Sequence, residues 1–224
     1  MPKVYLSPSN QTENRYAYGS TNEAEQCGRI ADACRIALER SGVTVKLGHM
    51  PSMQEKVRAS DAFGAELHIP IHTNAFNGSV MGTRMFCYNT GKGMAACKAI
   101  FARVAPLSPG TSESIQVNPK LYEVRVPKAP TAYIECEFHD TVEGARWIVE
   151  NAAAIGEAIA RGICDCFGVT FVESEPPKPA QPEQPAEQKL YRVQVGAFAS
   201  RANAEKMVQR LKEAGFDAFI RQDA

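Results

Sequence analysis

The segment Glu66-Leu67-His68-Ile69-Pro70-Ile71-His72-Thr73-Asn74-Ala75 holds the pattern from which the architecture of this chain follows. Leu67, Ile69 and Ile71 alternate with other residues, which predicts a buried strand. The strand ends near His72, and the small and polar residues after it indicate a loop. Open α/β proteins place their chemistry at the carboxyl ends of strands. His72 is therefore a candidate functional residue, although a lone histidine in such a place is more often a satisfied core residue.

The residues on either side of this strand have alternating strand and helix patterns. Strand patterns at 4–6 and 43–47 enclose a helical stripe of apolar residues. The helix begins after Thr21 or Asn22, either of which can cap it, and ends at Gly42. A strand, a helix and a strand at this spacing form a βαβ unit, so we predict an α/β fold with a mostly parallel sheet flanked by helices. The other predicted elements are helices at 52–64, 94–104 and 141–167, strands at 82–88, 121–126 and 132–138, and a surface loop at 106–120.

Composition limits the classes of partner. The 224 residues are 44% hydrophobic and 22% charged, which is ordinary for a globular protein with a core. Lys and Arg together number 25, as do Asp and Glu, so no net charge recruits nucleic acid or an acidic membrane. No apolar run is long enough to cross a bilayer. We therefore expect neither nucleic acid nor a membrane as a partner.

The cysteines and the first residues bear on where the chain is made. The seven cysteines are odd in number, form no CxxC pair and lie mostly in apolar periodic segments. We interpret them as reduced, buried thiols of a protein made in a reducing cytosol. Residues 1–7 have a strand pattern and lack the apolar segment of a signal peptide. We expect synthesis in the cytoplasm without a signal peptide.

A change of composition separates a small carboxyl-terminal module from the rest. Prolines alternate with Glu, Gln and Lys through 171–189, which predicts an extended, solvated linker between a catalytic domain at 1–170 and a module at 190–224. The module has strand patterns at 190–198 and 216–220 around a helical pattern at 202–214. This β-α-β fragment is too small to be stable alone, so we expect a partial α+β module completed by residues outside this chain or by a partner.

Three polar residues are placed for chemistry on this frame. Glu23 stands at a helix start, and His72 and Glu135 stand at strand ends. A histidine and a carboxylate on converging elements begin a catalytic zinc site, which has three protein ligands and an open position for water. A further carboxylate beside it would serve as general base to that water. Each residue also has a structural interpretation, since Glu23 could complement the helix dipole and Glu135 could be an ion-pair partner.

Residues 1 to about 170 resemble the zinc-dependent N-acetylmuramoyl-L-alanine amidases of the Amidase_3 type. The resemblance runs through Asn22-Glu23 and the following helix, Gly42-Val43-Thr44-Val45, the segment 66–75, and Gly82. It continues with Tyr122-Glu123-Val124-Arg125, Pro130 and the segment Ile134-Glu135-Cys136-Glu137-Phe138. It implies an amidase/phosphorylase-like sheet and hydrolysis of the amide between N-acetylmuramic acid and L-alanine in peptidoglycan.

The resemblance also implies roles for single residues. Glu23 and His72 match zinc ligands, and Glu135 matches the catalytic glutamate. Arg125 matches a recurrent arginine before the last strand, and with Asn74 of the His-x-Asn motif it is expected to contact the substrate. The implied cofactor is Zn²⁺.

One zinc ligand of the family is missing. The family has a histidine after the first strand, where this chain has Ser7-Pro8-Ser9-Asn10-Gln11. Asn10 is the nominal equivalent and is a poor zinc ligand. The candidates for the third ligand are His139, just beyond Glu135, and Glu13 in the opening loop. We favour His139, because imidazole suits zinc and it is close in sequence to a site residue, although it could equally be a surface histidine. His68 lies about 13 Å along the strand from His72, so it cannot share the metal.

The tail has a resemblance of its own. Residues 191–198, followed by Ala202-Asn203-Ala204-Glu205 and Leu211, are similar to the first half of a SPOR domain, a family that binds peptidoglycan glycan strands stripped of stem peptides. Gln194 and Phe198 match its motif, although Phe198 could simply pack on the helix. The implied partner of the whole chain is peptidoglycan.

Two other interpretations stay open. The missing histidine favours a peptidoglycan-binding protein that has lost catalysis, and bound zinc would distinguish the two. An α/β hydrolase or nucleotide-binding protein is disfavoured, because there is no G-x-S-x-G motif or phosphate-binding glycine loop. An amidase without an export signal fits a phage endolysin or a mother-cell autolysin, and either would act on the bacterial cell wall after release.

Overall fold

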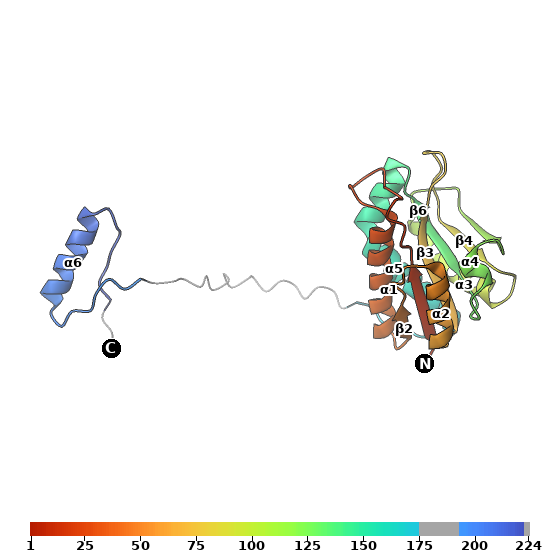
Figure 1. Cartoon of the computed structure of the whole chain (residues 1–224), viewed down its shortest axis with the longest axis horizontal. Helices are drawn as coiled ribbons and strands as arrows, with labels where there is room; N and C mark the ends of the chain where they lie inside the picture. The colour runs from red at the N-terminus through yellow and green to blue at the C-terminus, as the bar shows by residue number, and fades with distance from the viewer. Residues whose placement is uncertain (175–192, 222–224) are drawn as a thin grey trace. The chain divides into compact units, whose positions relative to one another are not determined.

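The computed structural model describes residues 1–174 and 193–221, and the chain divides into two units, Met1–Ser174 and Glu175–Ala224. The first unit is built on a sheet of six strands in the order β2-β1-β3-β6-β4-β5 (Figure 1). The strands are β1 (Lys3–Pro8), β2 (Thr44–Leu47), β3 (Leu67–Asn74), β4 (Arg84–Cys87), β5 (Ser114–Val117) and β6 (Tyr133–Phe138). Neighbours among β2, β1, β3 and β6 are parallel, and β4 runs antiparallel to β6. The predicted α/β fold with a mostly parallel sheet is confirmed.

One face of the sheet is apolar and carries the core. Side chains alternate between the two faces of a strand, and the registers bring Leu6, Ile69, Ile71, Ile134 and Met85 to the same face. These residues pack with buried side chains of three helices, α1 (Glu23–Arg40), α3 (Lys92–Val104) and α5 (Val142–Phe167). Full burial of aliphatic side chains on this scale, at roughly 1.5–3 kcal/mol each, is what holds the sheet to the helical layer.

The other face of the sheet is polar and carries the candidate residues His72 and Glu135. The same registers place on it the residues Tyr5, Ser7, His68, His72, Tyr133, Glu135 and Arg84. The helices α2 (Met53–Phe63) and α4 (Tyr122–Arg125) contact each other, and α2 contacts β1 on this side (Figure 1). The carboxyl ends of β1, β3 and β6 lie at one edge, because these strands are parallel. That edge is where the candidate residues meet.

Two sequence predictions between 106 and 126 are wrong. The expected surface loop at 106–120 contains a short 3-10 helix, Ala105–Leu107, and the edge strand β5. The expected strand at 121–126 is the single-turn helix α4. The buried side chain of Glu123 bonds to residues of the polar sheet face, and this tertiary contact overrides the local strand preference.

The second unit is described only in part. Its helix α6 (Arg201–Glu213) matches the predicted helix and buries none of its residues. The strands predicted at 190–198 and 216–220 do not form within the described residues 193–200 and 214–221, because no neighbouring strand pairs with them there. The linker predicted at 171–189 falls mostly outside the described residues. Within the part of the chain that the structure describes, no helix has the length and apolarity to cross a membrane.

Candidate active site

Glu23 and His72 form a buried pair at the carboxyl edge of the sheet. Asn22 caps α1 by accepting from the Glu25 amide at 3.0 Å, which fixes Glu23 at the helix start facing the end of β3. His72 Nδ1 lies 2.8 Å from Glu23 Oε1, and Asn14 Nδ2 donates to Glu23 Oε2 at 2.5 Å. The pair therefore joins α1 to β3 through two residues that are 49 positions apart in sequence.

Each member of the pair favours the charged form of the other. Burial alone would raise the pKa of Glu23, but hydrogen bonds with His72 and Asn14 outweigh it and lower the pKa. Burial alone would lower the pKa of His72, but the hydrogen bond to Glu23 and the nearby Glu135 outweigh it and raise the pKa. Glu23 and His72 therefore form a buried ion pair of one carboxylate and one imidazolium.

Glu135 lies directly opposite His72 in the parallel pair β3–β6. Its Oε2 atom is buried and has no hydrogen-bond partner among the described residues. Burial raises the pKa of Glu135 to about 7, while the charge of His72 lowers it and that of Glu23 raises it. A carboxyl group that titrates near neutrality can both accept and release a proton at working pH.

The aromatic ring of Tyr133 stacks against the imidazole of His72. Its ring stacks on His72 with centroids 4.7 Å apart, and Phe86 meets Tyr133 edge-on at 6.0 Å. His72 Nε2 is buried and has no hydrogen-bond partner in the described part of the chain. The ring is therefore oriented by stacking and by its Nδ1 contact. The sequence analysis did not identify Tyr133 as a site residue. Its position two residues before Glu135 on one strand could have indicated that both side chains point to the same face.

Gln11 occupies the place beside the pair that the family resemblance assigns to Asn10. Gln11 Nε2 lies 3.4 Å from Glu23 Oε1 and 3.4 Å from His72 Nδ1. Asn10 is directed elsewhere, because its Nδ2 donates to the Pro51 carbonyl at 2.7 Å. The irregular loop after β1 has no periodicity from which this one-residue difference could be read.

The other predicted site residues lie around the pair rather than in it. His139 Nδ1 lies 2.9 Å from Thr73 Oγ1, and its ring stacks on Tyr16 at 5.0 Å. Thr73 follows His72 and so points to the opposite face of β3, which is why the structure does not bring His139 to the pair. Glu13 is exposed in the opening loop.

Neither of the two predicted substrate contacts forms a hydrogen bond with Glu23 or His72. Asn74 is the last residue of β3, and its Oδ1 accepts from the Ala75 amide at 2.9 Å. Arg125 is exposed at the last position of α4.

A buried polar network lies behind the site on the same face. His68 contacts Ser60 Oγ through Nδ1 at 2.9 Å and Glu123 Oε1 through Nε2 at 3.2 Å, and Ser7 also donates to Glu123. Lys56 Nζ donates to the Pro8 carbonyl at 2.6 Å. This network ties α2 and α4 to the end of β1, as expected for His68 acting in the core rather than as a ligand.

Glu137 anchors two loops beside the site. Its Oε1 accepts from the amides of Gly82 and Phe138 at 2.6 and 2.7 Å, and its other oxygen accepts from Ser108. A Cβ on Gly110 would lie 2.2 Å from the Gly82 nitrogen, so the two loops are packed backbone to backbone. The carboxylate at 137 thus holds the segments before β4 and β5 together.

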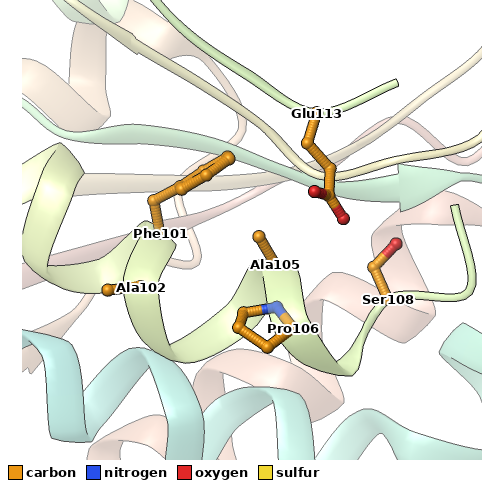
Figure 2. Close-up of a pocket in the computed structure, with 6 residues that line it drawn as sticks. All are labelled: Phe101, Ala102, Ala105, Pro106, Ser108 and Glu113. Atoms are coloured by element: carbon orange, nitrogen blue, oxygen red, sulfur yellow. The ribbon is translucent and has the colours of Figure 1, made fainter. Parts of the chain in front are cut away.

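A pocket lies on the outer side of this loop region. Figure 2 shows Glu113 and Ser108 directed into it from opposite sides. Its volume is about 340 Å³, and it is lined by Phe101, Ala102, Ala105, Pro106, Ser108 and Glu113. Neither Glu23 nor His72 lines it.

The donors around the pair differ from the ligand set that the family resemblance implies. No group of three His, Cys, Asp or Glu side chains is arranged for a metal within residues 1–174 and 193–221. Glu23 and His72 supply one carboxylate and one imidazole, and the amide of Gln11 can present its oxygen to the same point by rotating. Glu23 and His72 are ligand types of a catalytic zinc site, whereas the amide of Gln11 is a weak third donor to zinc.

Comparison with known proteins identifies both units. The family model described as N-acetylmuramoyl-L-alanine amidase (Amidase_3) matches residues 5–165, and the model described as SPOR domain matches residues 176–223. The sporulation-specific N-acetylmuramoyl-L-alanine amidase of Bacillus subtilis (strain 168) is 22% identical over 228 residues, which cover 98% of this chain and 84% of that protein.

Solved structures have the same fold. The catalytic domain of CwlV, an amidase from Bacillus (Paenibacillus) polymyxa var. colistinus, superposes with a TM-score of 0.68 at 14% identity. This match covers 76% of the present chain and all of that one. The catalytic domain of the CD27L endolysin, which targets Clostridia difficile, gives a TM-score of 0.63 at 20% identity over 74% of this chain and 98% of that one.

Proposed function

Because this chain belongs to the N-acetylmuramoyl-L-alanine amidase family and is a peptidoglycan amidase, we propose that Glu135, Glu23 and His72 carry its reaction. The bond cut is the amide between the lactyl group of N-acetylmuramic acid and the L-alanine of the stem peptide. The observation that carries the proposal is Glu135, a carboxylate with one unpartnered oxygen, placed opposite His72 and with a pKa of about 7.

Glu135 moves the proton in this reaction. It takes a proton from the attacking water, whose oxygen forms a bond to the lactyl carbonyl carbon. It then gives that proton to the alanine nitrogen as the carbon–nitrogen bond breaks, so a carboxylic acid and a free amine are released. A pKa near 7 suits both transfers, because neither the acid nor the base form is strongly disfavoured at neutral pH.

Glu23, His72 and Gln11 would hold a zinc ion, which when bound supplies a Lewis acid for the carbonyl and lowers the pKa of water. Tyr133 keeps the imidazole of His72 in place by stacking. Asn14 fixes the carboxylate of Glu23 from its other oxygen. Asn74 at the end of β3 and the exposed Arg125 at the end of α4 would contact the substrate.

The SPOR module extends the proposal to the intact bacterial cell wall, on which we place the action of the protein. Phe198 is 43% exposed, and with Gln194 it would contact glycan strands. Sedimentation of the full chain with purified walls tests this. Phe198→Ala should lower the bound fraction without changing the hydrolysis of a soluble muramyl peptide.

The test of the active site combines zinc content with turbidity loss of purified walls. Glu135→Gln should bind zinc as the wild type does and lose lysis by a factor of about 10² or more, because a neutral amide accepts no proton. Full lysis by Glu135→Gln would remove Glu135 from its role. Wild-type protein with neither zinc nor lysis would leave a peptidoglycan-binding protein as the function.

A further inference from the structure

Arg84 stands beside the catalytic carboxylate on the same face of the sheet. It is the first residue of β4, and it lies opposite Glu135 in the antiparallel pair β4–β6. Directly opposed residues on neighbouring strands point to the same side, with Cβ atoms about 4.5–5.5 Å apart. Because β4 runs against β6, its start lies at the edge where β3 and β6 end. The row across the sheet is therefore His72, Glu135 and Arg84.

The guanidinium of Arg84 is oriented but has no anion. Its Nη2 donates to Ser112 Oγ at 2.8 Å, and the group lies over the ring of Phe138 at 5.4 Å from the centroid. Its Nε atom is buried and has no hydrogen-bond partner among the described residues. The nearby carboxylate of Glu137 already accepts hydrogen bonds from the amides of Gly82 and Phe138 and from Ser108. No carboxylate in the described residues forms an ion pair with Arg84.

An arginine in this state has donors that an anion could use. Burying a cation without a counter-ion is costly, and the cost is removed when a ligand brings a negative charge. A guanidinium presents several N–H donors in one plane and matches a carboxylate with two parallel hydrogen bonds. Ser112 and Phe138 hold that plane in one orientation, so the free donors are preorganised.

The substrate offers negative charge on one side of the scissile bond only. N-acetylated sugars of the glycan are neutral, and the lactyl carboxyl of muramic acid is consumed in the amide that is cut. The free carboxylates all lie in the stem peptide beyond L-alanine. We propose that Arg84 binds the carboxylate of the residue that follows L-alanine, and so determines specificity for a stem peptide in which this group is free rather than amidated. The proposal rests on the amidase function given above.

Two soluble muramyl dipeptides that differ only in this group test the proposal. One has a free α-carboxylate on the residue after L-alanine, and the other has a primary amide there. The wild type should prefer the carboxylate by at least about tenfold in kcat/KM, the value of a hydrogen bond to a charged group. Arg84→Gln should lose the preference by slowing only the carboxylate substrate, and Arg84→Lys should restore part of it. Arg35→Gln, which replaces an arginine on α1 away from the sheet edge, is the matched control.

The outcomes separate this proposal from the amidase function. Hydrolysis of the two substrates would release two dipeptides that begin with L-alanine and differ in the same group. Calorimetry of their binding to the protein reports on Arg84 even where no bond is cut. Mass spectrometry of the reaction products reports which bond is cut. Equal binding of both dipeptides to the wild type would overturn the role of Arg84. An equal loss for both substrates in a folded Arg84→Gln protein would also overturn it, because that result indicates a structural role.

Discussion

Gln11 Nε2 lies 3.4 Å from His72 Nδ1, and by the same distance it also reaches the Glu23 carboxylate. In the proposed zinc site, a side-chain amide thus replaces the histidine that the family resemblance implies. Because an amide oxygen is a weaker donor than imidazole, the metal is expected to be held less tightly than by two histidines and a glutamate.

Substitution of Gln11 tests its place in the metal site. Gln11→Ala should lower zinc affinity by about tenfold or more, whereas Gln11→His should raise it, because imidazole replaces an amide. Zinc affinity is measured by competition with a chromophoric chelator, which does not depend on activity. Asn10→Ala is the matched control, since Asn10 bonds to Pro51 instead. Equal affinity in all three variants would exclude Gln11 from the site.

His139 gives the opposite expectation. Its Nδ1 is used by Thr73 and its ring by Tyr16, so His139→Ala should keep one zinc per chain. It should lower the free energy of unfolding by roughly 1–3 kcal/mol, through the lost hydrogen bond and stacking. Urea unfolding and metal analysis on the same preparation are sufficient. Loss of zinc from a folded His139→Ala protein would restore His139 as the third ligand.

Two glycines form a matched pair for the loop anchoring around Glu137. Gly82 has φ +141° and a Cβ there would lie 2.7 Å from the Ser112 carbonyl carbon, so Gly82→Ala should cost roughly 1–3 kcal/mol or more of stability. A Cβ added to Gly28, within α1, would meet no atom within 4 Å, so Gly28→Ala should stabilise by about 0.5–1 kcal/mol. Thermal unfolding of the two variants measures both. An unchanged stability in Gly82→Ala would show that the loops are not tightly packed.

Glu123 predicts an acid-sensitive contribution to stability. Burial alone would raise its pKa, but hydrogen bonds from His68 and Ser7 and the charge of Lys56 outweigh it and lower the pKa. A carboxyl whose pKa is lower in the folded state stabilises the fold above its unfolded pKa, about 4.3, and this contribution is lost as the pH falls through the folded value.

Glu123→Gln should therefore be less stable than the wild type by roughly 3 kcal/mol at pH 7. The gap should narrow as the pH falls below about 4.3, which urea titrations at about pH 7, 5 and 3 would follow. Exposed Glu113→Gln is the control and should show little difference at any pH. A gap of constant size would mean that the ionised form of Glu123 is not what stabilises the network.

The architecture could be predicted from the sequence better than the loops. Apolar alternation in 67–71 and helical stripes in α1 and α5 are decided by burial on one face, and the periodicity of apolar residues reports that burial directly. The strand predicted at 121–126 is wrong because the helix there is one turn long and depends on the contacts of Glu123. Gln11 could not be predicted, since only the folded loop decides which residue after β1 points at Glu23.

The register shift between β3 and β6 has a consequence for how such a site can vary. His72 pairs with Glu135 and Asn74 pairs with Phe138, so β6 carries one more residue than β3 over this interval. The extra residue gives room for Glu137 to bond to the neighbouring loops while Glu135 keeps its partner. The anchoring of the loops by Glu137 and the proton transfer proposed for Glu135 thus use different positions of the same strand. Changes in the loops that Glu137 anchors can therefore leave the register position of Glu135 unchanged.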